Sequence, residues 1–288
     1  MAKLLQVKGV SNSYVTRSLG SFGRRIEKPV LRDINIEMDF GEIFGIVGES
    51  GCGKTTLGRC VLGLIEYRGE ILIDGRRQES RGRRVFESTA KRRAMAGLAQ
   101  AVFQDPATSL NPTKRAGWLL EEPLRVNRLG SRAERLKRVD ETLELVGLDP
   151  SYKNRRVNEL SVGQKQRICI ACALMLKPRL IVADEAVSAL DVSVGAQILN
   201  LFRELNRTLG LGMVFISHNL NLVYYLCDRI AVMRKGRVVE QGNAEEVYGN
   251  PKDPYTKELL RAIPELPQAV PELPQAVPEL PRVIPEPP

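Results

Sequence analysis

The sequence lacks any long apolar run. Stretches such as Met213 to Ile216 are far shorter than the roughly 18 residues that a membrane-spanning helix requires. Met1 to Val10 has no extended apolar segment followed by a cleavage-like site, so no secretory signal is recognisable. We therefore expect a protein that stays in the cytoplasm. With 288 residues, of which 43% are hydrophobic, the chain can still bury one large core or two smaller ones.

Cysteine and histidine are both scarce. The five cysteines are an odd number and are scattered, which fits a reducing compartment better than a disulfide framework. Cys169 and Cys172 form a C-x-x-C pair, but no second pair and no histidine cluster lies near them. The spacing therefore indicates one face of a helix rather than a metal or redox site.

The charge is unbalanced, at +9 with a pI near 9.4. Much of the excess is local, because eight Lys and Arg residues lie between positions 76 and 93, with Phe86 as the sole aromatic among them. With so few aromatics for base stacking, a solvated basic loop is favoured and no nucleic acid is expected as a partner. Proximity to anionic lipid headgroups is the second interpretation.

Residues 48 to 55 match the phosphate-binding pattern G-x-x-x-x-G-K-[ST] at every fixed position. The glycines let backbone N–H groups curl around phosphates, Lys54 reaches the terminal phosphates, and the Thr55 hydroxyl is placed for Mg²⁺. The alternative is a Gly-rich surface turn. It is disfavoured because a buried-strand pattern precedes the loop at 42–47 and a helical pattern follows it at 55–64. The residues assigned to nucleotide contact are Gly48, Glu49, Ser50, Gly51, Cys52, Gly53, Lys54, Thr55 and Thr56.

Other segments show regular periodicity. Apolar residues alternate with polar ones at 34–40, as in a half-buried antiparallel strand, and a short strand at 70–73 is followed by an Asp74-Gly75 turn. Residues from about 105 to 165 look mainly helical. Within them, Ser131 and Glu134 form a capping box before a helix with an apolar stripe. The members of that stripe are Leu136, Val139, Leu143 and Val146.

Two further apolar runs, at 180–183 and 213–216, have the pattern of buried parallel strands. The helical stripe Ile198, Leu199, Phe202 and Leu205 lies between them. Asp184 and Glu185 follow the first strand, and His218 follows the second. Ligand groups lie at the carboxyl edge of such sheets, so these side chains should share the edge that presents the phosphate loop. A core histidine is the alternative interpretation of His218.

The C-terminal residues 264–288 differ in composition from the rest. Pro-Glu-Leu-Pro-Gln-Ala-Val occurs twice and a related heptad follows, so that nine of the 17 prolines lie here. Polyproline II or disorder is expected. A duplicated tail without a role and a segment that docks a partner both remain possible.

The order of the motifs resembles that of the ATP-binding cassette (ABC) ATPases. Leu160 to Gln164 is similar to the signature loop, Gln104 to the Q-loop glutamine, Ser188 to Asp191 to the D-loop, and His218 to the switch histidine. Tyr14 matches the aromatic that stacks on adenine, or else a strand residue that packs. Two positions depart from the usual pattern: Val162 replaces the first signature glycine and Ala186 the proline after the acidic pair.

The resemblance implies a set of roles. ATP would be bound with Mg²⁺, which Thr55, Gln104 and Asp184 would hold. Glu185 would be the general base, with Lys54, Gln104 and His218 as further catalytic residues. A facing cassette, identical or related, would complete the site. The residues implied to serve that facing subunit are Ser161, Val162, Gly163, Gln164 and Asp191.

The resemblance also implies an α/β fold, the P-loop NTPase fold of the ABC ATPases. It has a RecA-like mixed sheet core, an antiparallel β subdomain and an inserted helical subdomain. The expected domains are a nucleotide-binding domain at 1–245 with its helical part at about 105–165, an extension at 246–263 and the proline-rich tail at 264–288.

Closer similarities point to the oligopeptide, dipeptide and nickel importer branch. They lie in Asp105-Pro106, Ser109 to Pro112, Ala189 to Val194 and Asn250 to Thr256. We therefore expect the ATP-hydrolysing subunit of an importer for a peptide-like or nickel-type solute, peripheral at the inner face of the cell membrane. Separate permease subunits and, indirectly, a substrate-binding protein would be its partners. The alternatives are a soluble ABC ATPase acting on nucleic acid or ribosomes and a non-hydrolysing regulatory cassette.

Overall fold

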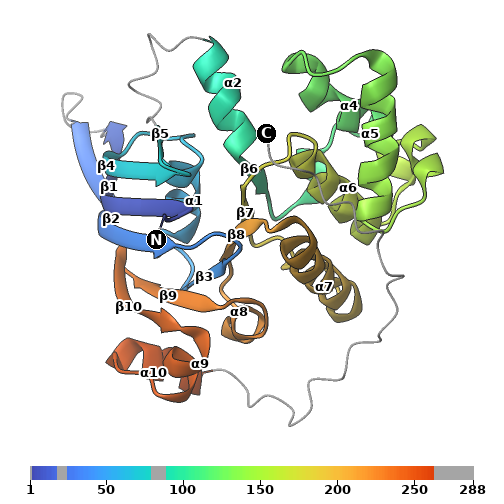
Figure 1. Ribbon diagram of the computed structural model, residues 1–288. Coiled ribbons are helices and arrows are strands. Elements are labelled where there is room, and N and C mark those ends of the chain that lie inside the picture. The colour runs from blue at the N-terminus through green and yellow to red at the C-terminus, as the bar shows by residue number, and fades with distance from the viewer. Residues whose placement is uncertain (1, 18–24, 79–88, 263–288) are drawn as a thin grey trace. The chain divides into compact units, whose positions relative to one another are not determined.

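The computed structural model describes residues 2–17, 25–78 and 89–262 (Figure 1). The chain divides into two compact units, one of residues 1–95 and 212–264, the other of residues 96–211 and 265–288. The predicted proline-rich tail and much of the basic segment lie outside the described residues. The predicted domain boundaries at 245 and 263 remain a prediction.

The first unit contains a four-stranded antiparallel sheet in the order β2-β1-β4-β5 (Figure 1). Its strands are β1 (Leu5–Arg17), β2 (Arg25–Met38), β4 (Arg68–Ile73) and β5 (Arg76–Gln78). In β2, Ile34, Ile36 and Met38 are buried, so the predicted alternation is confirmed there. It is wrong at Phe40, which is 46% exposed, because the strand ends at Met38 and the chain turns at Gly41.

The same unit contains parallel strands with an antiparallel edge. β3 (Ile43–Val47) pairs in parallel with β8 (Gly212–Ile216) and with β9 (Arg229–Arg234), and β10 (Arg237–Asn243) pairs antiparallel with β9. Every residue of β3 and β8 is buried, which explains why their sequences are continuous apolar runs rather than alternating ones.

Within its described residues, this unit wholly contains four helices, namely α1 (Lys54–Val61), α8 (Leu220–Leu226), α9 (Ala244–Gly249) and α10 (Pro254–Arg261). α2 (Thr89–Leu98) crosses the boundary between the units. The predicted helix at 55–64 is correct in place but too long. Gly63 adopts φ = 62° and donates its N–H to the Cys60 carbonyl, which ends α1 before Leu64.

The second unit is mainly helical (Figure 1). Its elements are β6 (Ala99–Val102), α3 (Pro106–Ser109), α4 (Ala116–Val126), α5 (Arg132–Leu145), the short 3₁₀ segments η2 (Pro150–Asn154) and η3 (Val157–Glu159), α6 (Val162–Leu174), β7 (Leu180–Asp184) and α7 (Val192–Leu209). β6 and β7 pair in parallel. The predicted helical content of 105–165 is confirmed.

The capping box predicted before α5 is also confirmed. The Glu134 N–H donates to the Ser131 hydroxyl, and the Ser131 N–H donates to the Glu134 carboxylate. Val139, Leu143 and Val146 are buried as expected, whereas Leu136 is 39% exposed. The buried stripe of α5 therefore begins at Val139, one residue of the predicted set later than the spacing indicated.

In α7 the predicted stripe is buried throughout, and Phe202 has no exposed surface. We expect Phe202→Ala to lower the free energy of unfolding by about 3–5 kcal/mol, because a large core side chain is lost and its cavity stays. The exposed Gln197 of the same helix provides a control, since Gln197→Ala should change stability by no more than about 0.5 kcal/mol. Urea denaturation of the full chain measures both. Equal effects of the two substitutions would contradict this assignment of the core.

Candidate nucleotide-binding site

The phosphate loop connects β3 to α1 in the first unit, and its backbone has little freedom. Gly48 and Gly53 have φ values of 147° and 112°, in the left-handed region that side-chain-bearing residues rarely adopt. A Cβ atom on Gly48 would lie 2.2 Å from the Met233 carbonyl oxygen in β9. Glycine is therefore required at Gly48 both by conformation and by the close approach of a neighbouring strand.

Lys54 is buried at the start of α1. Its Nζ donates to the carbonyl oxygens of Gly48 at 2.7 Å and Glu49 at 3.0 Å, so the ammonium group closes the loop from within. An ammonium group held by neutral carbonyls can transfer its bonds to a more strongly accepting anion. The arrangement suits a phosphate ligand.

The start of α1 leaves backbone donors for such a ligand. Gly53 is the N-cap, and no side chain among the described residues accepts a hydrogen bond there. The first N–H groups of the helix and its partial positive charge thus lie beneath the loop. Ser50 and Gly51 are exposed, Thr55 is half-buried and Thr56 is buried, so the loop has an accessible tip on a buried base.

Cys52 lies within the loop but is buried. Burial raises the pKa of its thiol, although the Lys54 ammonium opposes the shift, so the side chain stays a neutral thiol. The Cys52 carbonyl accepts a hydrogen bond from the Gly236 N–H in the β9–β10 turn at 2.9 Å. Cys52 therefore helps to fix the loop against the C-terminal third of the chain.

Two other predicted residues belong to the first unit. His218 is exposed just after β8, which does not fit the alternative of a core histidine. Tyr14 in β1 is 40% exposed, so its ring is accessible at the surface of the antiparallel sheet.

The acidic pair lies in the second unit, at the carboxyl end of β7. Asp184 is the last residue of the strand and is 8% exposed. Glu185 is half-buried with φ = 50°, a left-handed conformation that is uncommon for glutamate. Its carbonyl accepts hydrogen bonds from the N–H and the hydroxyl of Ser188, which hold the turn in this conformation. Such strain is concentrated at functional sites.

The predicted signature and D-loop residues also lie in this unit, at the N-termini of two helices. Ser161 caps α6 in a capping box with Gln164, and Asp191 caps α7 by accepting from the Val194 N–H. A Cβ atom on Gly163 would lie 2.7 Å from Val194 Cγ1, so the two helix starts are in close contact.

The surface around these two caps is open. Ser161 and Asp191 are exposed, and Val162 is 51% exposed. Gln104 is exposed as well, in the segment after β6.

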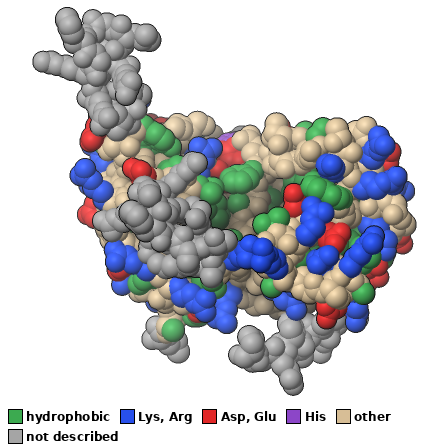
Figure 2. Space-filling model, turned by 90° about the horizontal axis from the view of Figure 1, so that it is seen from above, with side chains coloured by type: hydrophobic (Ala, Val, Ile, Leu, Met, Phe, Trp, Pro, Cys, Tyr) green, Lys and Arg blue, Asp and Glu red, His purple; other side chains and the backbone are tan. Residues whose placement is uncertain are grey.

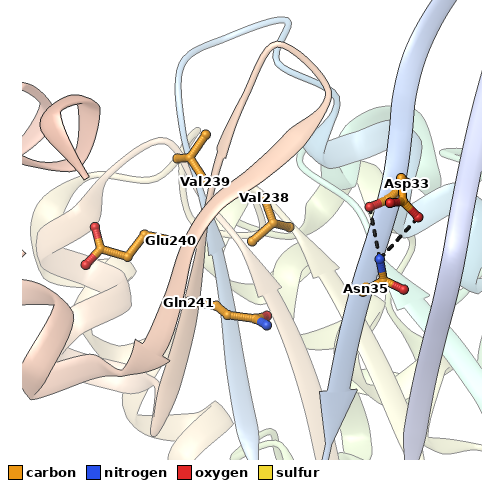
Figure 3. Close-up of a pocket in the computed structure, with 6 residues that line it drawn as sticks. All are labelled: Asp33, Asn35, Val238, Val239, Glu240 and Gln241. Carbon is orange, nitrogen blue, oxygen red and sulfur yellow. Dashed lines mark hydrogen bonds between the residues drawn. The ribbon is translucent and has the colours of Figure 1, made fainter. Parts of the chain in front are cut away.

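A shallow pocket of about 290 Å³ lies elsewhere on the first unit, between β2 and β10 (Figure 3). Asp33, Asn35 and residues 238–241 line it, and none of them is a predicted site residue. Figure 3 shows the Glu240 side chain pointing away from Asp33 and Asn35. The pocket is therefore not part of the nucleotide site.

Sequence reasoning missed one neighbour of the loop. The Glu49 N–H donates to the hydroxyl of Tyr255 in α10 at 3.1 Å, across 206 positions of sequence. The only signal was the similarity of Asn250 to Thr256 to the importer branch, which gave Tyr255 no role.

Comparisons with known proteins identify the family. Residues 31–188 match the family described as ABC transporter, and residues 239–285 match the oligopeptide/dipeptide transporter C-terminal region. The chain belongs to the ABC transporter family. The predicted family and fold class are thereby confirmed, and the chain is an ABC ATPase.

Curated relatives of this ABC ATPase have names that refer to import. A putative peptide import ATP-binding protein of Brucella ovis is 47% identical over 262 residues, which cover 91% of this chain and 78% of that protein. The glutathione import ATP-binding protein GsiA of Salmonella paratyphi A is 45% identical over 264 residues, which cover 91% of this chain but 41% of the longer relative.

Two solved ABC proteins share the fold. CbiO1 of Clostridium perfringens, part of the ABC transporter complex CbiONQ, has a TM-score of 0.73 at 29% identity, covering 87% of this chain and 92% of that chain. The ATP-binding cassette MJ0796, in a dimeric post-hydrolysis state bound to ADP and Pi, has a TM-score of 0.69 at 29% identity, covering 83% and 98%.

The Lys54 contacts generate a prediction. We expect Lys54→Ala to weaken ATP binding about 10- to 100-fold, because a charge-assisted contact to the phosphates is lost. Lys8→Ala, at an exposed position of β1, is the matched control and should bind as the unaltered chain does. Titration with a fluorescent ATP analogue measures both. An affinity unchanged by Lys54→Ala would refute the assignment of the phosphate loop.

Proposed function

We propose that this ABC ATPase is the ATP-hydrolysing subunit of an importer that takes up a peptide-like solute through separate membrane subunits. The observation that carries the proposal is the match of residues 239–285 to the oligopeptide/dipeptide transporter C-terminal region. The same chain has a phosphate loop that matches its pattern at every fixed position. The peptide and glutathione import relatives support the same solute class.

The names of the import relatives support membrane partners. Permease subunits form the path through the bilayer, and the ATPase lies at the inner face of the cell membrane beside them. Among the described residues, no helix is long and apolar enough to cross a bilayer. CbiO1, as part of the CbiONQ complex, is a precedent for such an assembly. A substrate-binding protein takes part only indirectly.

ATP hydrolysis requires neutralised phosphate charge and an aligned water. Lys54 contacts the terminal phosphates, and Tyr14 stacks on the adenine. Glu185, fixed by its turn, polarises the attacking water as general base, and His218 hydrogen-bonds the γ-phosphate.

The donor set fits Mg²⁺. Thr55, Gln104 and Asp184 offer hydroxyl, amide and carboxylate oxygens, the hard ligands that Mg²⁺ prefers. Mg²⁺ that binds with a nucleotide is usually held by one or two carboxylates together with substrate phosphates and waters, which matches a set with a single carboxylate. When bound, Mg²⁺ neutralises charge that develops on the phosphate oxygens.

A second cassette, identical or related, completes the site. The residues that face its nucleotide are Ser161, Val162, Gly163, Gln164 and Asp191. In the single chain, Ser161, Val162 and Asp191 are exposed and the other two are half-buried, so this surface is accessible to a partner. The dimeric MJ0796 state is a precedent for such pairing. Binding of ATP closes the pair and hydrolysis reopens it, because the contacts to the γ-phosphate exist only before hydrolysis.

The two other classes of function are not favoured. A nucleic-acid-dependent ATPase would need basic side chains interleaved with stacking aromatics, whereas Phe86 is the sole aromatic among the eight Lys and Arg residues at 76–93. Over the face that Figure 2 shows, Lys and Arg side chains lie beside acidic ones. A non-hydrolysing cassette would need a broken site, but Lys54, Asp184, Glu185 and His218 are all present.

Co-purification from native membranes tests the importer. We expect permease subunits to co-purify with the chain. We also expect a peptide or glutathione to stimulate the ATPase activity when its binding protein is present. Stimulation by nickel ions alone would overturn the solute class, and a salt-sensitive complex with RNA or DNA in place of permeases would overturn the importer itself.

Glu185→Gln should reduce hydrolysis about 10²- to 10⁴-fold, the usual contribution of a general base, while ATP binding remains and the closed dimer accumulates. Glu144→Gln, on the exposed face of α5, removes a carboxylate elsewhere and should hydrolyse normally. Phosphate release and size-exclusion chromatography with ATP measure the two effects. Near-normal turnover in Glu185→Gln would refute the general base.

Asp184→Asn should raise the Mg²⁺ concentration required for half-maximal hydrolysis by about tenfold or more, because an amide oxygen is a weaker ligand than a carboxylate. ATPase activity titrated with Mg²⁺ against a fixed ATP concentration measures the shift. The same Mg²⁺ dependence in both proteins would remove Asp184 from the metal site.

A further inference from the structure

The C-terminal end of the first unit is anchored close to the phosphate loop. The Glu240 carboxylate in β10 accepts hydrogen bonds from the backbone N–H groups of Lys252 at 2.8 Å and Asp253 at 3.0 Å. Asp253 in turn caps α10 by accepting from the Tyr255 N–H at 2.8 Å. These bonds fix the chain direction at the start of α10, and hence the position of Tyr255.

The Glu240 carboxylate is a firm anchor. Burial alone would raise its pKa, but the neighbouring Thr256 hydroxyl and the hydrogen bonds from the Lys252 and Asp253 N–H groups outweigh burial and lower it. The carboxylate is therefore ionised at neutral pH. Its stabilising effect is present above the ordinary glutamate pKa and is lost as the pH falls through the lowered value.

Tyr255 is buried beside Arg234. It is 2% exposed, and the Arg234 guanidinium lies 4.5 Å from its ring centroid, at a distance typical of a cation–π contact. Burial raises the pKa of the Tyr255 hydroxyl, which stays a neutral phenol. Its oxygen accepts the Glu49 N–H at 3.1 Å. The hydroxyl thus contacts the first peptide group of the loop after Gly48.

Two side chains therefore hold this turn of the loop. The Lys54 ammonium group donates to the carbonyl oxygens of Gly48 and Glu49, and the Tyr255 hydroxyl accepts from the Glu49 N–H. The Lys54 bonds must be redirected when its ammonium group contacts a phosphate. The Tyr255 bond occupies the Glu49 N–H and leaves the other backbone N–H groups of the loop to the phosphates, so it can persist through the binding step.

We propose that Tyr255 is a positioning residue for the phosphate loop, through which the C-terminal region holds the loop in its nucleotide-binding shape. The inference rests on the proposed function only in taking ATP as the ligand of this loop. It gives the importer-type C-terminal region a role within its own chain. Pre-ordering of the loop lowers the entropy cost of ATP binding, so the effect belongs to affinity and not to the chemical step.

Tyr255→Phe removes the hydroxyl and keeps the ring. We expect the dissociation constant and the KM for ATP to rise about 3- to 10-fold, the equivalent of one neutral hydrogen bond, with kcat changed by less than about twofold. Tyr248→Phe is the matched control, because Tyr248 lies in the same C-terminal region and its hydroxyl donates to Asn221 in α8 and not to the loop. It should leave both constants unchanged.

A second measurement follows the loop itself. Hydrogen exchange of the peptide that spans residues 48–53, in the full chain without nucleotide, should be faster in Tyr255→Phe and unchanged in Tyr248→Phe. Glu240→Gln, which weakens the anchor of α10 without altering the ring, should shift exchange and KM in the same direction by a smaller factor.

The outcomes divide clearly. An unaltered ATP affinity and exchange rate in Tyr255→Phe, or a lower kcat at constant KM, would overturn the positioning role. A loss of thermal stability with normal affinity would overturn it too, because it would show that the contact only packs α10. An unmodified chain that hydrolyses ATP but purifies without permeases would overturn the proposed importer and leave this test intact.

Discussion

The close approach of the phosphate loop to strand β9 is the constraint on which the rest of the nucleotide site depends. A Cβ atom on Gly48 would lie 2.2 Å from the Met233 carbonyl oxygen, so the loop can leave β3 only along a path open to glycine. That path points the α1 N-terminus at the loop and places Lys54 inside it. Because β9 comes nearly 190 positions later in the sequence than Gly48, the loop depends on a fold that the local motif does not encode.

What the sequence predicted well was decided locally. The capping box joins Ser131 and Glu134, which are three positions apart at the start of one helix. It needs no distant partner, and it formed as expected. The continuous apolar runs of β7 and β8 reflect burial on both faces, a property of their own residues. The alternation in β2 failed only at Phe40, where the turn at Gly41, rather than residue periodicity, determined the backbone.

What the sequence could not predict depends on distant partners. Nothing near Tyr255 indicates that its hydroxyl would accept the Glu49 N–H, because both residue types are ordinary for a helix and a loop. Likewise, no feature in the sequence of the adjacent Asp184 and Glu185 predicts their different backbone conformations. Asp184 ends an extended strand, whereas Glu185 turns into the left-handed region and is held there by Ser188.

The contacts also explain why a C-terminal region can matter to a loop formed early in the chain. Gly236 donates to the Cys52 carbonyl, Met233 backs Gly48, and Tyr255 accepts from Glu49, so three groups beyond residue 230 contact the loop from outside. Lys54 contacts it from inside and is the group that must change partners. A loop whose outer contacts are independent of nucleotide can exchange its inner ones without collapsing, which is the property that repeated binding and release of ATP requires.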